Sequence, residues 1–97
     1  MIVVRYKQRY KKRKLTVTGH AGAGPEGHDL VCAGASTLVL TVIGALTVNG
    51  IKYHSDIRDG YAEVRCIDPA AASVYNTVMC GFETLRTMYP ELIDVVY

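Results

Sequence analysis

A run of nineteen residues from Leu30 to Val48 carries no charged side chain, and it constrains the fold more than any other feature of this chain. Its length approaches the roughly 20 apolar residues that a membrane-spanning helix needs. The run is nevertheless interrupted by small and hydroxylated residues: Gly34, Ser36, Thr37, Thr41, Gly44 and Thr47. A signal peptide would place its basic residues directly against the apolar run, whereas a strand-like segment and a glycine-rich loop intervene here. We therefore interpret residues 30–48 as a core helix and expect no membrane partner.

The residues that flank this run define the ends of the predicted helix. Asp29 is a good N-cap, because its carboxylate can accept a hydrogen bond from an unpaired backbone amide in the first turn. Asn49-Gly50 is a typical left-handed helix ending. Ninety-seven residues suffice for one two-layer core, so we expect a single domain over residues 1–97.

Alternation of apolar and polar residues predicts two β-hairpins around this helix. The first covers residues 2–20, with a basic turn at Lys11 to Arg13 and with Tyr10 on the same side as the apolar residues. The second covers residues 51–67 and turns at Asp59-Gly60, a strong signal for a two-residue turn. Counting back from this turn predicts three facing pairs on one mostly apolar face: Ile57 with Ala62, Ser55 with Val64, and Tyr53 with Cys66.

A second helix and a short final strand complete the predicted fold. Asp68-Pro69 is typical of a helix start, and Tyr89-Pro90 ends the helix. One apolar stripe recurs at steps of three and four residues: Ala71, Val74, Tyr75, Val78, Phe82 and Leu85. The element order ββαββαβ indicates an α+β fold, in which two helices pack on a small mixed or antiparallel sheet.

The three cysteines, Cys32, Cys66 and Cys80, form neither an even disulfide set nor a CxxC pair. A reducing cytoplasmic setting is the simplest interpretation of this pattern. We expect Cys66, on the inward side of a strand, and Cys80, beside the apolar helix stripe, to be core residues.

Positive charge is concentrated near the start of the chain. Seven of the eleven lysines and arginines lie within residues 5–14, in a chain of net charge +2. Such a cluster could attract RNA or an acidic partner. Because no aromatic RNA-stacking motif accompanies the charges, we favour a solvated strand face and do not expect nucleic acid as a partner. A non-enzymatic module that binds the ribosome or RNA through this hairpin stays as an alternative.

The stretch "GHAGAGPEGHDLVC", residues 19–32, places His20 twelve positions before Cys32 across a glycine-rich segment. If Asp29 caps the helix, Cys32 lies in its first turn, where the unpaired amides and the helix dipole favour a thiolate. His20 ends a strand, and strand ends and helix starts lie at one edge of a two-layer α/β arrangement. A Cys32–His20 nucleophile–base pair is therefore plausible, and the amides at the helix start would be able to hold an oxyanion.

Two other interpretations of these residues remain. Cys32 would be an ordinary buried helix residue and His20 a solvated side chain if the two do not meet. A zinc site built from His20, His28 and Cys32 matches no common spacing and lacks a fourth ligand, so we expect no metal or other cofactor.

The blocks "TGHAG" and "DLVCAGAS", separated by a short variable loop, resemble the ribosomal-processing cysteine proteases (the Prp family). The resemblance covers length, element order and the small residues after the cysteine, including Ser36. It implies a small sheet with two helices, a homodimer, and a cysteine endopeptidase that removes a short N-terminal extension from a large-subunit ribosomal protein. It further implies that Cys32 is the nucleophile and His20 the general base. Asp29 matches the acidic position of the family and would either orient the histidine or only cap the helix.

The resemblance also implies a substrate-binding loop before the helix. Its residues here would be Gly19, Ala21, Gly22 and Gly24, together with Ser36 after the cysteine. We expect residues 21–28 to be a mobile lid, because the glycines tolerate positive φ and little apolar surface can be buried. The loop "AGAGPEG" departs from the family at Ala23, where an aromatic residue is common. Because the family also occurs near phage capsid genes, a phage structural protein is an alternative substrate.

Overall fold

The computed structural model describes residues 1–22 and 29–97. Its elements follow the order ββαββαβ, which confirms the predicted α+β fold. The strands and helices are β1 (Ile2–Arg9), β2 (Lys12–Thr18), α1 (Leu30–Val48), β3 (His54–Arg58), β4 (Tyr61–Ile67), the 3₁₀ turn η1 (Pro69–Ala71), α2 (Ala72–Met88) and β5 (Ile93–Val96).

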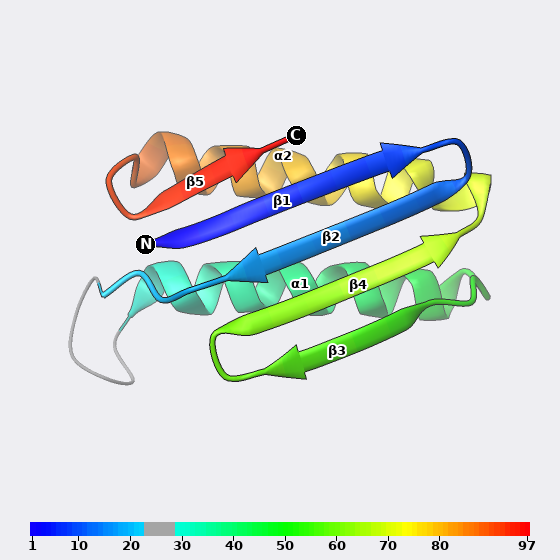
Figure 1. The fold of residues 1–97 in the computed structure, drawn as a ribbon, viewed down its shortest axis with the longest axis horizontal. Coiled ribbons are helices and arrows are strands. Elements are labelled where there is room, and N and C mark those ends of the chain that lie inside the picture. Colours follow the sequence, from blue (N-terminus) through cyan, green and yellow to red (C-terminus); the bar gives the residue numbers. More distant parts are fainter. Residues whose placement is uncertain (23–28) are drawn as a thin grey trace.

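The five strands form one mixed sheet in the order β3-β4-β2-β1-β5. Neighbouring strands are antiparallel except β1 and β5, which run parallel. Figure 1 shows both helices on the same side of this sheet, α2 behind β1 and β5 and α1 near β4. In the part of the chain that the structure describes, no helix covers the opposite side, which we call the open face of the sheet.

The core lies between the helices and the inward-facing side chains of the sheet. The buried stripe of α1 recurs at steps of three and four residues: Val31, Ala35, Val39, Val42 and Leu46. By length and composition alone α1 could also cross a membrane. In this fold its buried stripe instead faces β4 and α2, which is the core-helix role that the sequence predicts.

Glycines allow α1 and α2 to approach closely. A Cβ at Gly81 of α2 would lie 2.5 Å from Cδ2 of Leu38 on α1. In the same way, a Cβ at Gly34 of α1 would lie 3.2 Å from Cδ2 of Leu85 on α2. The position of α1, which carries Cys32, is therefore set partly by the absence of side chains at these two positions.

The first hairpin differs from the sequence prediction in the position of its turn. Arg9 pairs with Lys12, so the turn consists of Tyr10 and Lys11, and Tyr10 takes a positive φ of 55°. Tyr10 is 89 % exposed and does not join the apolar side of β1. Arg13 belongs to β2 rather than to the turn, and its side chain is buried, with Nη1 donating to the carbonyl of Tyr10 at 2.9 Å.

Two further expectations are corrected. The pairs Ile57–Ala62 and Ser55–Val64 are confirmed, but β3 begins at His54, so Tyr53 lies outside the ladder and its hydroxyl bonds to Thr47 instead. Cys66 is buried as predicted, whereas Cys80 is exposed. The buried residues of α2 are Tyr75, Val78, Met79 and Phe82, so the core side of the helix carries Met79, and Cys80, one position later, points to solvent.

Candidate active site

Asp29 caps α1 and so fixes the position of Cys32 in the first helical turn. Its Oδ1 accepts hydrogen bonds from the amides of Val31 and Cys32, each at 3.0 Å, and its carbonyl accepts from the amide of Ala33 at 3.0 Å. These bonds confirm the predicted cap. The amides of Val31, Cys32 and Ala33 therefore already donate to Asp29.

The Cys32 thiol lies against the backbone that follows His20. The amide of Ala21 donates to Sγ of Cys32 at 3.4 Å, and the Ala21 side chain is buried. The two sequence blocks, one ending β2 and one starting α1, are thus brought to the same place, as the sequence predicts.

His20 is held at the end of β2 by backbone contacts to two other parts of the chain. The amide of Gly19 donates to the carbonyl of Gly60 at 2.9 Å, and the carbonyl of His20 accepts from the Met1 ammonium at 2.7 Å. Gly19 has φ +92°, and a Cβ there would collide with the carbonyl of Met1. Only glycine fits this position without strain.

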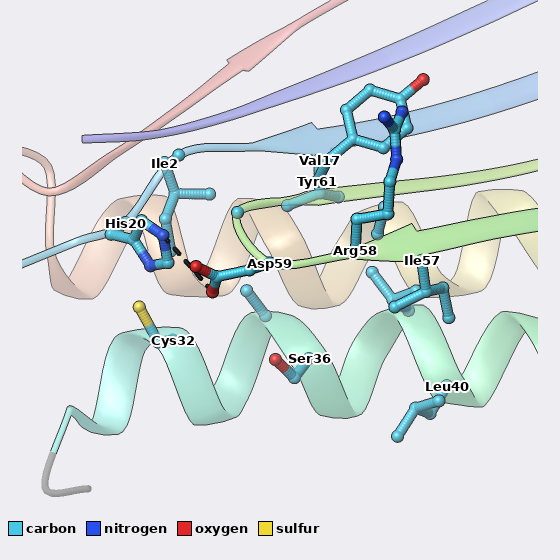
Figure 2. Close-up of a pocket in the computed structure, with 15 residues that line it drawn as sticks. Ile2, Val17, His20, Cys32, Ser36, Leu40, Ile57, Arg58, Asp59 and Tyr61 are labelled. Carbon is cyan, nitrogen blue, oxygen red and sulfur yellow. Dashed lines mark ion pairs between the residues drawn. The ribbon is translucent and has the colours of Figure 1, made fainter. Parts of the chain in front are cut away.

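The imidazole of His20 lies between Cys32 and the β3–β4 turn. Figure 2 shows the Cys32 sulfur pointing toward the ring from α1. Nε2 of His20 is 3.8 Å from Oδ1 of Asp59, an ion pair when the ring is protonated. Both side chains are largely exposed, so solvent weakens their attraction.

Sequence reasoning did not identify Asp59 as a functional candidate. Asp59 is followed by Gly60, and this dipeptide is so typical of a hairpin turn that its turn role accounts for both residues. The signal lies in the strand order: β4 pairs with β2 along its whole length, so Tyr61 faces Thr18 and the preceding turn meets the residues that follow Thr18. That neighbour relationship cannot be obtained from either segment alone.

A cavity of about 370 Å³ extends from His20 and Cys32 between α1 and the β3–β4 hairpin. His20, Cys32 and Asp59 lie at one end, and Figure 2 shows Ser36 and Leu40 following along α1. The opposite wall includes Ile57, which is 53 % exposed. The cavity therefore offers polar, reactive groups at one end and apolar surface along its length, which suits a peptide segment.

The remaining candidates fall into two groups. Gly19, Ala21 and Ser36 lie at or beside the cavity, and Gly22 takes a positive φ of 65° with open space where a Cβ would be. Gly24, His28 and the expected lid over most of residues 21–28 lie outside the described residues. In the described ranges, no group of three metal-ligating side chains is present.

Comparison with known proteins places this arrangement in one family. The family model for cysteine protease Prp matches residues 1–94. The ribosomal processing cysteine protease Prp of Staphylococcus aureus (strain Mu50 / ATCC 700699) is 30 % identical over 93 residues, covering 90 % of this chain and 88 % of the relative. Its namesake in Mycoplasma pneumoniae is 28 % identical over 83 residues, covering 84 % and 83 %.

The fold agrees with solved structures over the whole chain. The S. aureus Prp structure with a covalently linked product peptide superposes with a TM-score of 0.89 at 28 % identity, covering 100 % of this chain and 99 % of that one. The S. aureus structure with a substrate peptide gives a TM-score of 0.83 at 26 % identity, with the same coverage. This chain therefore belongs to the Prp family of cysteine proteases and is a hydrolase.

Proposed function

We propose that this protein is an endopeptidase in which Cys32 is the nucleophile and His20 the general base. The observation that carries the proposal is the 3.4 Å hydrogen bond from the Ala21 amide to Cys32 Sγ. This bond holds Ala21, the residue after His20, against the Cys32 sulfur at the end of a peptide-sized cavity. A nucleophile, a base and a binding groove are the minimum set for covalent peptide hydrolysis.

The reaction proceeds in two halves. The Cys32 thiol gives its proton to His20, and the sulfur attacks the scissile carbonyl carbon, forming a tetrahedral oxyanion. Its collapse breaks the C–N bond, and His20 returns the proton to the leaving amine. His20 then takes a proton from water, and the resulting hydroxide hydrolyses the thioester and restores the thiol.

The oxyanion needs hydrogen-bond donors other than the capped amides of the first turn. The Ala21 amide already points at the sulfur to which the carbonyl carbon becomes bonded, so we propose it as one donor. Ser36 lies one helical turn after Cys32 and lines the same cavity, so its hydroxyl is placed to contact the substrate backbone. Asp59 orients the His20 ring from its far side.

The proposed substrate is the N-terminal extension of a large-subunit ribosomal protein in the cytoplasm. Support comes from the relatives named ribosomal processing proteases and from the peptide complexes of the S. aureus protein. The apolar length of the cavity fits a hydrophobic segment before or after the scissile bond.

Mass spectrometry of the host ribosomal protein, incubated with this protein, tests the proposal. We expect one cut between the extension and the mature chain with the wild type, and none with Cys32→Ala. The Cys80→Ser variant, altered at an exposed cysteine far from the dyad, is the matched control and should cleave normally. Cleavage of only a phage capsid protein would replace the proposed substrate, and cleavage by Cys32→Ala would overturn the proposed nucleophile.

We also propose that two copies associate through α1. Although its buried stripe faces the core, Leu30 is 71 % and Val48 86 % exposed on the same helix, and neither lines the cavity. Burial of such side chains against a second copy would remove apolar surface from water. Sedimentation at micromolar concentration should give twice the mass of the chain, and a monomer would reject the dimer.

A further inference from the structure

Contrary to the expectation from the sequence, we propose that the open face of the sheet binds the phosphate backbone of RNA at the end that carries the β1–β2 turn. The proposed surface, called the basic face below, consists of six side chains from three adjacent strands: Arg5, Lys7, Arg9, Lys12, Lys14 and Arg65. All six are exposed.

The strand register gathers these charges in rows. Lys7 of β1 faces Lys14 of β2, and Lys14 faces Arg65 of β4. His54 of β3 continues the same row beside Arg65, so one row crosses four strands. Arg9 and Lys12 form a second row, two residues nearer the turn. Facing residues share a side of the sheet, so these side chains project together from the open face.

This arrangement is unfavourable for the isolated sheet. Like charges directly opposite each other destabilise a strand pair. Glu63 relieves one of them, since its Oε1 lies 3.2 Å from Nζ of Lys14. The other acidic residues of this face lie toward the far end: Asp56, which pairs with Arg58 at 3.2 Å, and Asp94, which lies beside Val3 on β5. Asp68 follows β4 near the turn, but its carboxylate caps η1 by accepting from the Ala70 amide at 2.9 Å.

The spacing of the rows suits a polyphosphate chain. Successive side chains on one side of a strand are about 6.6 Å apart, and neighbouring strands are about 4.8 Å apart. A flat lattice of cations at these distances can contact several phosphates at once and release their counterions. Tyr10, almost fully exposed at the turn, adds a ring on which an unpaired base can stack.

The choice of RNA over other polyanions rests on the proposed function, because ribosomal proteins are assembled on RNA. Binding there would hold the protease beside its substrate. The basic face and the catalytic cavity are also separate: the cavity lies on the helix side of the sheet, at the His20 end of β2. RNA and peptide therefore do not compete, and each activity can be measured without the other.

Fluorescence anisotropy with a labelled RNA hairpin, titrated over a range of salt concentrations, tests this proposal. Lys7→Gln should weaken binding several-fold and reduce the slope of log affinity against log salt by about one, as expected when one phosphate contact is lost. Glu63→Gln should strengthen binding, because it frees Lys14 and removes the negative charge beside the row that Lys14 belongs to. Cleavage of a short peptide should be unchanged in both variants.

Arg86→Gln is the matched control, since it removes one positive charge from α2, where Arg86 pairs with Glu83 at 2.7 Å. It should leave RNA binding unchanged. The proposal is overturned if the RNA does not bind, or if Arg86→Gln weakens binding as much as Lys7→Gln. Stronger binding to polyglutamate or to anionic lipid vesicles than to RNA would also overturn it and assign the face to an acidic protein or a membrane surface. If RNA binds but no peptide is cleaved, the proposed protease activity is rejected and the proposal that the basic face binds RNA is retained.

Discussion

Gly60 lies against the imidazole of His20: a methyl group at position 60 would come within 2.9 Å of Nε2. Gly60 also has φ +68°, which favours glycine at the second position of the β3–β4 turn. This residue therefore has two roles. It closes the hairpin, and it leaves room for the ring that faces Cys32.

Gly60→Ala should reduce peptide cleavage well beyond its effect on stability. The new methyl group displaces the His20 ring, while the positive φ costs about 1–2 kcal/mol. Gly50→Ala is the control, because Gly50 has φ +67° and open space around a Cβ. We expect similar losses of thermal stability in both variants but a large loss of kcat only in Gly60→Ala. Equal cleavage by the two variants would show that the ring tolerates the contact.

Asp59→Asn should lower kcat about two- to fivefold and leave KM unchanged, because an exposed ion pair contributes little. The reason is orientation: Oδ1 of Asp59 lies 3.8 Å from Nε2 of His20 and favours one ring position. High salt should remove the difference from the wild type, since it screens exposed charges. Asp56→Asn, altered on the same hairpin, should behave as the wild type. A difference that persists in high salt would assign Asp59 a purely steric role.

Much of this fold follows from local sequence signals. Asp29, Asn49-Gly50 and Asp59-Gly60 mark boundaries that the structure reproduces, because caps and turns depend on a few adjacent residues. The exposure of Cys80 and the loss of Tyr53 from β3 could not be predicted in this way. Both depend on which surface a neighbouring element covers, which is decided by the packing of residues distant in the sequence.

The same distinction applies to the site. His20 and Cys32 lie in two recognisable blocks, and the helix cap places one of them. Asp59 reaches His20 only because β4 pairs with β2 and brings its preceding turn to the end of that strand. The cap also bears on the choice of oxyanion donors, because the N-cap that satisfies the amides of Val31 and Cys32 already uses them.

The three cysteines should differ in alkylation and in its consequences. Burial raises the pKa of the Cys66 thiol, so Cys66 should stay unmodified in the folded protein. Cys80 is exposed and should react without loss of cleavage, whereas modification of the half-buried Cys32 should abolish it. Peptide mapping after iodoacetamide treatment of the wild type and of Cys80→Ser, with parallel activity measurements, checks this. Full activity after stoichiometric labelling of Cys32 would exclude it as the nucleophile.

Gly44→Ala and Gly81→Ala should change stability in opposite directions. Gly44 lies in α1 with open space around a Cβ, so alanine should stabilise the helix by about 0.5–1 kcal/mol. At Gly81 the same methyl group meets Leu38 of α1 at 2.5 Å and must displace it, which outweighs the gain in helix propensity. Denaturant unfolding of both variants measures the two effects. A stabilised Gly81→Ala would mean that Leu38 can move without cost.

Two substitutions at Asp29 distinguish a capping role from a catalytic one, because alanine removes both the cap and the charge, whereas asparagine removes only the charge. Asparagine caps a helix as well as aspartate does, but it carries no charge. Asp29→Ala should therefore cost about 0.5–2 kcal/mol of unfolding free energy, through the lost bonds to the amides of Val31 and Cys32. Asp29→Asn should keep most of that stability.

Cleavage by Asp29→Asn then separates the two roles. If Asp29 only positions Cys32 through the cap, the asparagine variant should retain nearly all of the wild-type kcat. If its charge also orients His20 or supports its protonated form, kcat should fall although the helix start is intact. We expect near wild-type cleavage, because the charged contact of His20 is made by Asp59. A kcat loss in Asp29→Asn as large as that in Asp29→Ala, with stability preserved, would move Asp29 into the catalytic machinery.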